Sequence, residues 1–462
     1  MFRKKILNGL CLATMTVTFC ACSINVPPPD LYSDPNAINS IKSARSLLTS
    51  CYLLYPHYEY ELSTIGNDFC LTNLSGKDVE QQNLYLWQDN TLSNFASESW
   101  LTYYNCIANC DILLDRLPNV KLEQTSDSTM LNNIKAEGKT LKAMAYFDIL
   151  RLFSSAYDNT TDQAGMIIKT KTGVEDKARS SKTESVNYIK GLLTEAATVN
   201  NTPTSNGWLS QNAAIYLLAE VSLYEGNYEN AAKYAQQLID VCDASYIDKN
   251  NYERIWDSPS YAGRIFAFNV NSSYYASIQY SDEGDYFAVN PEFAYSENDG
   301  RKNWAIYPKT ISGINHNLLG KYNKTNKENG TISYINRMRY AGAYFIAAEA
   351  YARLKKDNIA IKTINTYLNA EGANPLSENL TGDELIQSIL KEKYKEFVGE
   401  GQNYFDLKRT HAEALPRYAA WGNSTRSTIQ STDYRWTFPI PASEYRYNNA
   451  VTQNNGWPIN RN

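Results

Sequence analysis

Apolar residues recur along most of this chain at every third or fourth position, which is the spacing of an amphipathic helix. In the segment 38–58, for example, Ala44, Leu47, Leu48 and Cys51 would share one helical face. The same spacing predicts helices over residues 38–58, 97–117, 130–153, 184–199, 208–224, 228–241, 339–354 and 359–368. The chain is therefore expected to be mostly α-helical.

Two pairs of predicted helices resemble each other and resemble a tetratricopeptide unit. The first pair spans 208–241 and turns at Glu225-Gly226-Asn227, where Gly and Asn suit a left-handed helix end. The second pair spans 339–368 and turns at Asp357-Asn358. Alanines in both pairs allow the helices to approach closely, but a lone pair cannot bury its own apolar face. We therefore expect several such pairs to stack.

Two segments, 66–93 and 243–335, do not follow the helical pattern. The longer one is rich in Tyr, Asn, Ser, Gly and Asp, and its apolar run at 264–270 predicts a strand. Loops carried by a rigid scaffold are where function usually lies. We therefore expect these two loop-rich regions to hold the functional residues.

The tyrosine content is high, with 36 Tyr and 8 Trp among 462 residues. Aromatic rings can stack on the apolar faces of sugar rings, while a few well-placed polar groups bind the hydroxyls. On this reasoning the candidate ligand-binding residues are Asp68, Trp87, Asp89 and Asn90 in the first segment, and Tyr274, Tyr275, Tyr286, Tyr295, Arg301 and Trp304 in the second.

The charge and hydropathy of the chain exclude two classes of protein. The net charge is −5 and there is no basic run, which argues against a nucleic-acid partner. The mean hydropathy of −0.47 excludes a polytopic membrane protein.

The N-terminus predicts export and lipid attachment. A basic cluster at residues 3–5 precedes an apolar run over 6–21, which is too short to span a membrane comfortably and suits an export signal. Cys22 follows the small Ala21, as in the motif cleaved before a lipid-bearing cysteine, whereas Cys20 follows the bulky Phe19. The several acyl chains of such a cysteine give stable anchoring. The predicted organisation is a signal peptide at 1–21, a lipid-anchored tether at 22–30 and one domain at 31–462.

The sequence has no recognisable metal-binding or catalytic motif. Five cysteines remain after the signal, an odd number without the spacing of a disulfide scaffold, and Cys106 and Cys110 are expected to face the core. The three histidines are not clustered, so no zinc site or other cofactor is expected. No known nucleophile, metalloprotease or phosphate-loop motif is present, and no catalytic residue is assigned.

Two C-terminal segments resemble the SusD/RagB family. Residues 385–409 resemble the family signature "I..ER..E...EG.R..DL.R", with Lys393 and Asn403 in place of the usual arginines. Residues 438–457 resemble the closing pattern "PIP..E...N....QN.GY". The positions of the signature that match are Glu392, Glu396, Glu400, Gly401, Asp406, Leu407 and Arg409.

This resemblance implies a SusD-like helical domain and a role in nutrient capture. Members of the family are surface lipoproteins that cover a TonB-dependent, SusC-like barrel and capture oligosaccharides, or peptides in the RagB branch. The protein would then lie in the outer membrane and face the cell exterior, although residues 23–26 lack the acidic residues often found after a surface-exported lipidated cysteine. Trp87, Asp89 and Asn90 are the first choice for the site, because family binding residues often lie in this insertion.

The signature carboxylates Glu392, Glu396 and Asp406 are interpreted as structural partners of arginines and helix ends rather than as catalytic acids. Three alternatives to a glycan binder remain: a peptide or glycopeptide binder, a helical-repeat scaffold that binds only proteins, and a glycosidase. The last would need two carboxylates about 5–9.5 Å apart across a cleft.

Overall fold

The computed structural model describes residues 37–72, 79–158, 164–169, 176–271, 287–322, 332–418 and 425–459. The chain divides into two units, residues 1–37 and 38–462, and every helix and strand named below belongs to the second. The signal peptide, the tether and Cys22 lie outside the described residues, as do Tyr274, Tyr275 and Tyr286.

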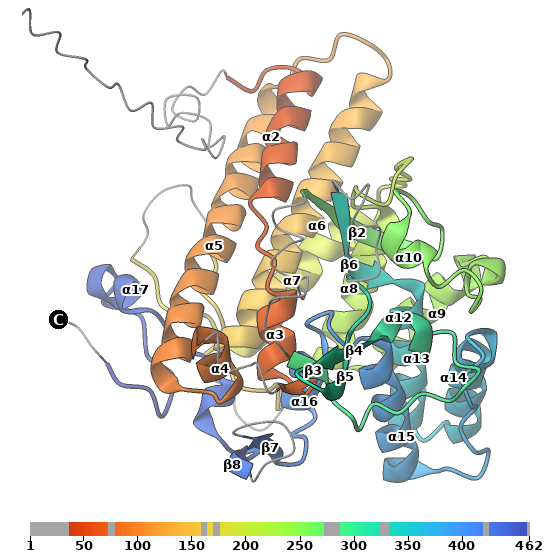
Figure 1. Cartoon of the computed structure of the whole chain (residues 1–462). Coiled ribbons are helices and arrows are strands. Elements are labelled where there is room, and N and C mark those ends of the chain that lie inside the picture. The colour runs from red at the N-terminus through yellow and green to blue at the C-terminus, as the bar shows by residue number, and fades with distance from the viewer. Residues whose placement is uncertain are drawn as a thin grey trace, which may run out of the picture. The chain divides into compact units, whose positions relative to one another are not determined.

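Helices make up most of the second unit (Figure 1). Their bounds are α2 Ile41–Leu53, α3 Glu59–Ile65, α4 Val79–Tyr85, α5 Asp89–Arg116, α6 Asp127–Phe153, α7 Lys182–Ala197, α8 Gln211–Tyr224, α9 Tyr228–Val241, α10 Arg254–Asp257, α12 Lys302–Ala305, α13 Tyr340–Arg353, α14 Asp357–Ala370, α15 Gly382–Glu396, α16 Asn403–Arg409 and α17 Ala442–Tyr447. Among the described residues, no helix combines the length and apolarity needed to cross a bilayer.

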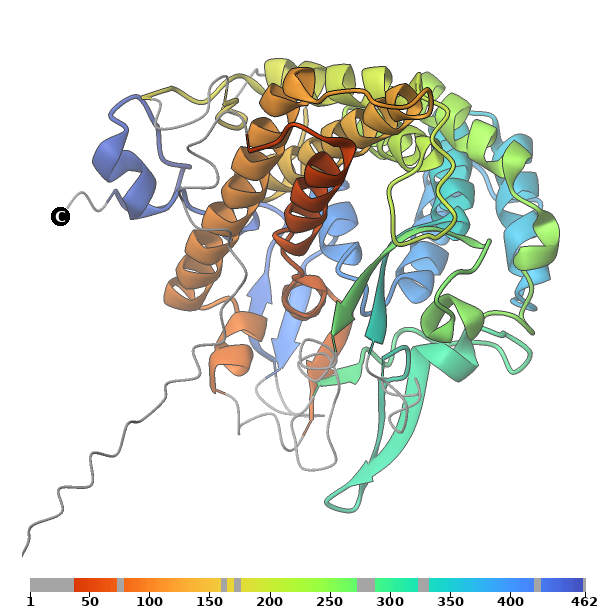
Figure 2. The same ribbon diagram turned by 90° about the horizontal axis from the view of Figure 1, so that it is seen from above.

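The long helices stack in chain order. Each of α5, α6, α7 and α8 packs on the helix that follows it, and α13 continues the row by packing on α9, α14 and α15. Figure 2 shows the row as an arc, with the strands on its inner side. The pairs α8–α9 and α13–α14 turn through left-handed residues, Gly226 at φ +76° and Lys355 at φ +60°. The predicted stack of tetratricopeptide-type helix pairs is therefore confirmed.

The central helix α6 is buried over its whole second half. Its C-terminal carbonyls face protein rather than water, so they need partners from elsewhere in the chain. The Lys408 ammonium donates to Arg151 O at 2.6 Å, and the Phe438 amide donates to Leu152 O at 3.1 Å. The side chains of Arg179 and Asn454 donate to the carbonyl of Phe153 at 2.7 and 2.8 Å. The end of α6 is thus completed by segments distant in sequence.

Short antiparallel strand pairs lie against the helices. In the described part of the chain they form four two-stranded sheets, which pair β1 Phe69–Leu71 with β3 Phe287–Val289, β2 Arg264–Asn271 with β6 Ile332–Arg339, β4 Ile306–Ile311 with β5 Ile314–Leu319, and β7 Leu415–Tyr418 with β8 Thr425–Ile429. The β1–β3 pair joins the two regions that were predicted to be rich in loops.

Several boundaries differ from those predicted. The region 66–93 holds α4 and the start of α5, because Leu84, Leu86 and Leu92 pack into the core. The first predicted helix ends at Leu53 rather than at 58, three residues before Pro56. The region 243–335 contains α10, α12 and five strands or parts of strands, of which β2 matches the predicted strand at 264–270.

Candidate ligand-binding groove

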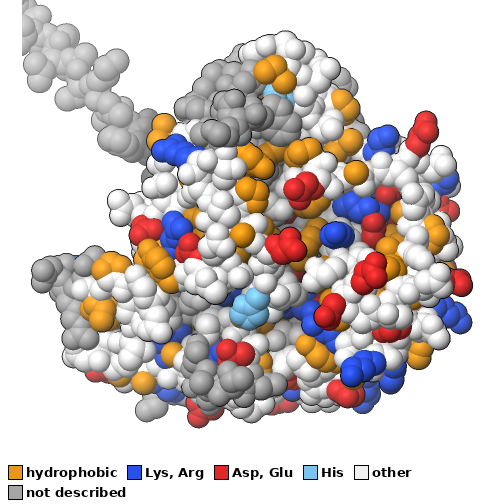
Figure 3. Space-filling view, turned by 90° about the horizontal axis from the view of Figure 1, so that it is seen from below, with side chains coloured by type: hydrophobic (Ala, Val, Ile, Leu, Met, Phe, Trp, Pro, Cys, Tyr) orange, Lys and Arg blue, Asp and Glu red, His pale blue; other side chains and the backbone are white. Residues whose placement is uncertain are grey.

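A groove with a volume of about 1110 Å³ lies where β1, α15, α16 and β7 meet. It exceeds the roughly 300–1,000 Å³ of an ordinary small-molecule pocket. Its lining comprises Asn67, Phe69, Cys70, Leu71, Tyr85, residues 290–294, Gln387, Lys391, Glu392, Tyr394, Lys395, Leu407, residues 410–416 and Tyr418. The face of the molecule that carries β7 and β8 mixes acidic, basic and hydrophobic side chains (Figure 3).

The floor of the groove is apolar and fixed. Phe69, Leu71 and Tyr85 are each 1% exposed, and β1 is held by its pairing with β3. Asn290, directly after β3, donates from its amide to Asp68 O at 2.8 Å and from its side chain to Asn67 O at 3.1 Å. These bonds join the two regions of the chain that form the floor.

One wall is a single face of α15. Gln387, Lys391, Tyr394 and Lys395 are spaced four, three and one residues apart, so they project from the same side of the helix. The opposite side, which includes Leu385 and Ile389, is buried. Another part of the lining follows α16 and comprises residues 410–416 and Tyr418. A ligand would therefore meet amide, ammonium and phenol groups on one side.

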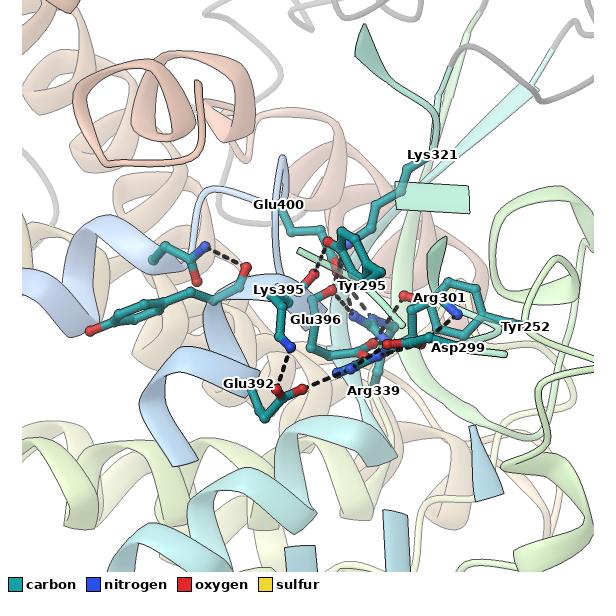
Figure 4. Close-up of polar contacts among 12 residues, drawn as sticks. Tyr252, Tyr295, Asp299, Arg301, Lys321, Arg339, Glu392, Lys395, Glu396 and Glu400 are labelled. Carbon is teal, nitrogen blue, oxygen red and sulfur yellow. Dashed lines mark hydrogen bonds and ion pairs between the residues drawn. The ribbon is translucent and has the colours of Figure 1, made fainter. Parts of the chain in front are cut away.

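A buried charge network supports the α15 wall (Figure 4). Arg301 donates to Asp299 and to Glu392, each at 2.7 Å, and Glu392 also pairs with Lys395. Deeper in the protein, Arg339 pairs with Glu396 and Glu400, each at 2.7 Å. Because Glu392 and Lys395 line the groove, this network fixes the groove wall from behind.

The pairing determines how the signature carboxylates ionise. Burial alone would raise the pKa of Glu396, but the charges of Arg339, Arg301 and Lys321 outweigh it and hold the pKa below its usual range. Asp406 pairs with Lys393 at 2.7 Å and with Arg409. Glu392, Glu396 and Asp406 are thus each paired with a cation.

Asp68 connects the floor to the turn between α15 and α16. It is fully buried and accepts from the Gly399 amide at 2.8 Å and from the Asn403 side chain at 2.7 Å. Burial raises its pKa from 3.8 to about 6, against the lowering effect of these two hydrogen bonds. Glycine is needed at position 399, where φ is +76° and a Cβ would lie 2.4 Å from Leu319.

None of the candidate residues that the structure describes is on the groove lining. Trp87 is 1% exposed, donates from Nε1 to Ile65 O at 2.9 Å and packs edge-on against Trp436. Like Asp68, Arg301 is fully buried. The rings and charges of these three residues are therefore engaged inside the protein.

The remaining described candidates are more accessible. Tyr295 and Trp304 are half-buried, and the Tyr295 hydroxyl donates to Lys395 O at 2.8 Å, behind the groove wall. Asp89 and Asn90 are exposed at the start of α5, where Asp89 accepts from the Tyr434 hydroxyl. The structure does not bring these four residues together on one surface.

The wall formed by 387–418 was missed, because that segment was interpreted only as a structural signature. The polar side of α15 is visible in the sequence, where Gln387 and Lys391 alternate with the buried Leu385 and Ile389. Among the described residues, no group of three His, Cys, Asp or Glu side chains could hold a metal ion. Cys106 and Cys110 are buried, as expected.

Two comparisons of the sequence with known proteins both match SusD-like proteins. The sequence model of the SusD family matches residues 152–457. The SusD-like protein P2 of Formosa agariphila is 23% identical over 409 residues, which cover 76% of this chain and 77% of that protein.

Solved structures share the fold at low sequence identity. A SusD superfamily protein of Bacteroides thetaiotaomicron has a TM-score of 0.77 at 22% identity, covering 90% of this chain and 99% of that one. A putative sugar binding protein of Bacteroides vulgatus has a TM-score of 0.77 at 21% identity, covering 91% and 99%. The surface glycan-binding protein A of Bacteroides uniformis has a TM-score of 0.71 at 18% identity, covering 89% and 99%.

Proposed function

The chain belongs to the SusD family, and we propose that it is a surface lipoprotein that captures oligosaccharides or polysaccharides in its groove. From there it passes them to a SusC-like TonB-dependent transporter of the outer membrane. The protein binds its ligand without chemically changing it.

The observation that carries this proposal is the composition of the groove. Phe293 and Tyr418 are half-buried on its lining and can present apolar surface to sugar rings. Asn67, Asn290 and Gln387 offer amide groups that both donate and accept hydrogen bonds, as sugar hydroxyls require. A volume of about 1110 Å³ favours a chain of several sugars over a single one.

Two further observations support the proposal. Structural relatives are described as a putative sugar binding protein and as a surface glycan-binding protein. The N-terminal sequence, with its apolar run at 6–21 followed by Cys22, fits a lipid anchor that would keep the protein next to a membrane transporter.

The test is binding of soluble protein, begun at Asp30, to laminarin, pullulan, xylan, polygalacturonate and a tryptic digest of casein. Affinity electrophoresis would identify the ligand class, and isothermal titration calorimetry would give its Kd. We expect one polysaccharide class to bind, and expect Phe293→Ala and Tyr418→Ala each to weaken it about tenfold, or about 1.4 kcal/mol. Tyr447→Ala is the matched control, because Tyr447 is 76% exposed and lies outside the groove lining.

Other outcomes would replace the proposal. Binding of the casein peptides alone would make the protein a peptide binder, and hydrolysis of any polysaccharide would make it a glycosidase. If nothing binds, a scaffold that recognises only proteins becomes the best account. The transporter partner is tested separately, by co-purification of a SusC-like barrel with the full lipidated chain.

A further inference from the structure

His411 occupies a backbone position that usually belongs to glycine. It follows the C-terminal end of α16 at φ +49°, and the Ala412 amide donates to Leu407 O at 3.0 Å to close the helix end. Glycine adopts this left-handed conformation without steric cost, whereas a side chain is disfavoured there. A histidine at this position therefore carries a steric cost that a glycine would avoid.

Among the residues that the structure describes, three others with a side chain share the left-handed conformation, and in two of them the fold offsets its cost. Trp87 buries its indole ring and makes a hydrogen bond with it. Ser312 forms, with Gly313, the two-residue turn of the β4–β5 hairpin, a turn type that requires positive φ at both positions. Lys355 ends α13 on an exposed surface away from the groove.

His411 has neither a buried, hydrogen-bonded side chain like Trp87 nor a place in a two-residue hairpin turn like Ser312. The side chain is exposed and lies on the groove lining, and it makes no hydrogen bond to any residue that the structure describes. On the same lining, Glu392 and Lys395 of α15 already pair with each other. The other charged groups on the lining are Lys391, Glu292 and Glu413.

We propose that His411 is a ligand-contacting residue of the groove and that its ring nitrogens bind hydroxyl groups of a glycan. A neutral imidazole has one N–H donor and one acceptor nitrogen, which matches a hydroxyl group that both accepts and donates. This inference rests on the proposed function and adds to it a specific point of contact.

The small number of histidines makes a direct test possible, because the chain has three. In protein labelled with ¹³C on the histidine rings, each of the four polysaccharides named above is added and the ring signals are followed by NMR. We expect the binding polysaccharide to shift the His411 signal. The signals of His57 and His316, which lie outside the groove lining, serve as internal references.

Variants give the second readout. We expect His411→Asn and His411→Gly to weaken binding at least fivefold, while His411→Gly keeps or raises the thermal unfolding midpoint because it relieves the backbone. Lys355→Gly is the matched control: it makes the same change at an exposed left-handed helix end outside the groove, and it should raise the midpoint without altering binding.

An unshifted His411 signal, together with unchanged affinity in both His411 variants, overturns the inference. If Phe293→Ala still weakens binding in that case, the groove remains the binding site and only the role of His411 is refuted. If none of the four polysaccharides binds the wild-type chain, the glycan-binding function fails and the inference fails with it.

Discussion

Glu371 gives the protein a dependence of stability on pH that one substitution should remove. This residue follows α14, is 3% exposed, and has one carboxylate oxygen without a hydrogen-bond partner among the described residues. Burial, followed by the negative charge of Glu396, raises its pKa from 4.5 to about 8, despite the opposing charges of Arg301 and Arg339. At neutral pH the folded protein therefore holds a proton here that the unfolded chain releases.

The sign and size of the effect follow from proton linkage. Because the folded pKa lies above the unfolded one, this group's contribution to stability is fully present below pH 4.5 and is lost as pH rises towards 8. Each pH unit in this window lowers the unfolding free energy by about 1.4 kcal/mol. Relative to pH 4.5, the loss at pH 7 is therefore about 3 kcal/mol. Gln resembles the protonated acid in shape and charge, and does not titrate.

The measurement is urea unfolding of the wild type and Glu371→Gln, followed by tryptophan fluorescence at intervals from pH 4.5 to 9. We expect the two proteins to have similar stability at the acid end, and the variant to be more stable by about 3 kcal/mol at pH 7. Glu378→Gln is the control, because Glu378 is exposed in the same connection. If the stabilities of the wild type and Glu371→Gln stay parallel across the pH range, Glu371 is already ionised in the folded protein and the reasoning is wrong.

Three further outcomes are expected. Trp87→Ala should lower the unfolding free energy by about 3–5 kcal/mol, as removal of a buried tryptophan does, and should shift the urea midpoint rather than only the ligand affinity. Arg301→Met should cost about 3–5 kcal/mol in the same assay, because Asp299 and Glu392 lose a buried cation, and it should also weaken polysaccharide binding through the α15 wall. Cys22→Ser should abolish incorporation of radiolabelled palmitate and release the protein from the membrane fraction, whereas Cys20→Ser should do neither.

The helical stack was predictable because its signal is local. The apolar positions of α8 and α13, and the Gly226 turn, lie within single stretches of sequence and follow one periodicity. The groove depends instead on pairings between distant segments, such as Phe69 with Val289 in the β1–β3 sheet. Nothing in the pattern around either residue indicates the other.

Trp87 illustrates why the site residues could not be chosen from the sequence. It was favoured as an aromatic in an apparently irregular insertion, but the insertion is partly helical and the indole turns inward onto Trp436. That contact joins two segments that are far apart in the chain, so the pattern around Trp87 cannot indicate the direction of its ring. The binding hypothesis for Asp89, Asn90, Tyr295 and Trp304 stays a prediction.

The completion of α6 by distant segments has a consequence for the order of events during synthesis. Lys408 and Asn454, which bind its last carbonyls, are made long after the helix itself. In a growing chain Arg179 can bond the Phe153 carbonyl early, but the carbonyls of Arg151 and Leu152 lack these donors until the segment from Lys408 to Phe438 has left the ribosome. The last turn of the central helix is therefore completed only after nearly the whole chain has been made.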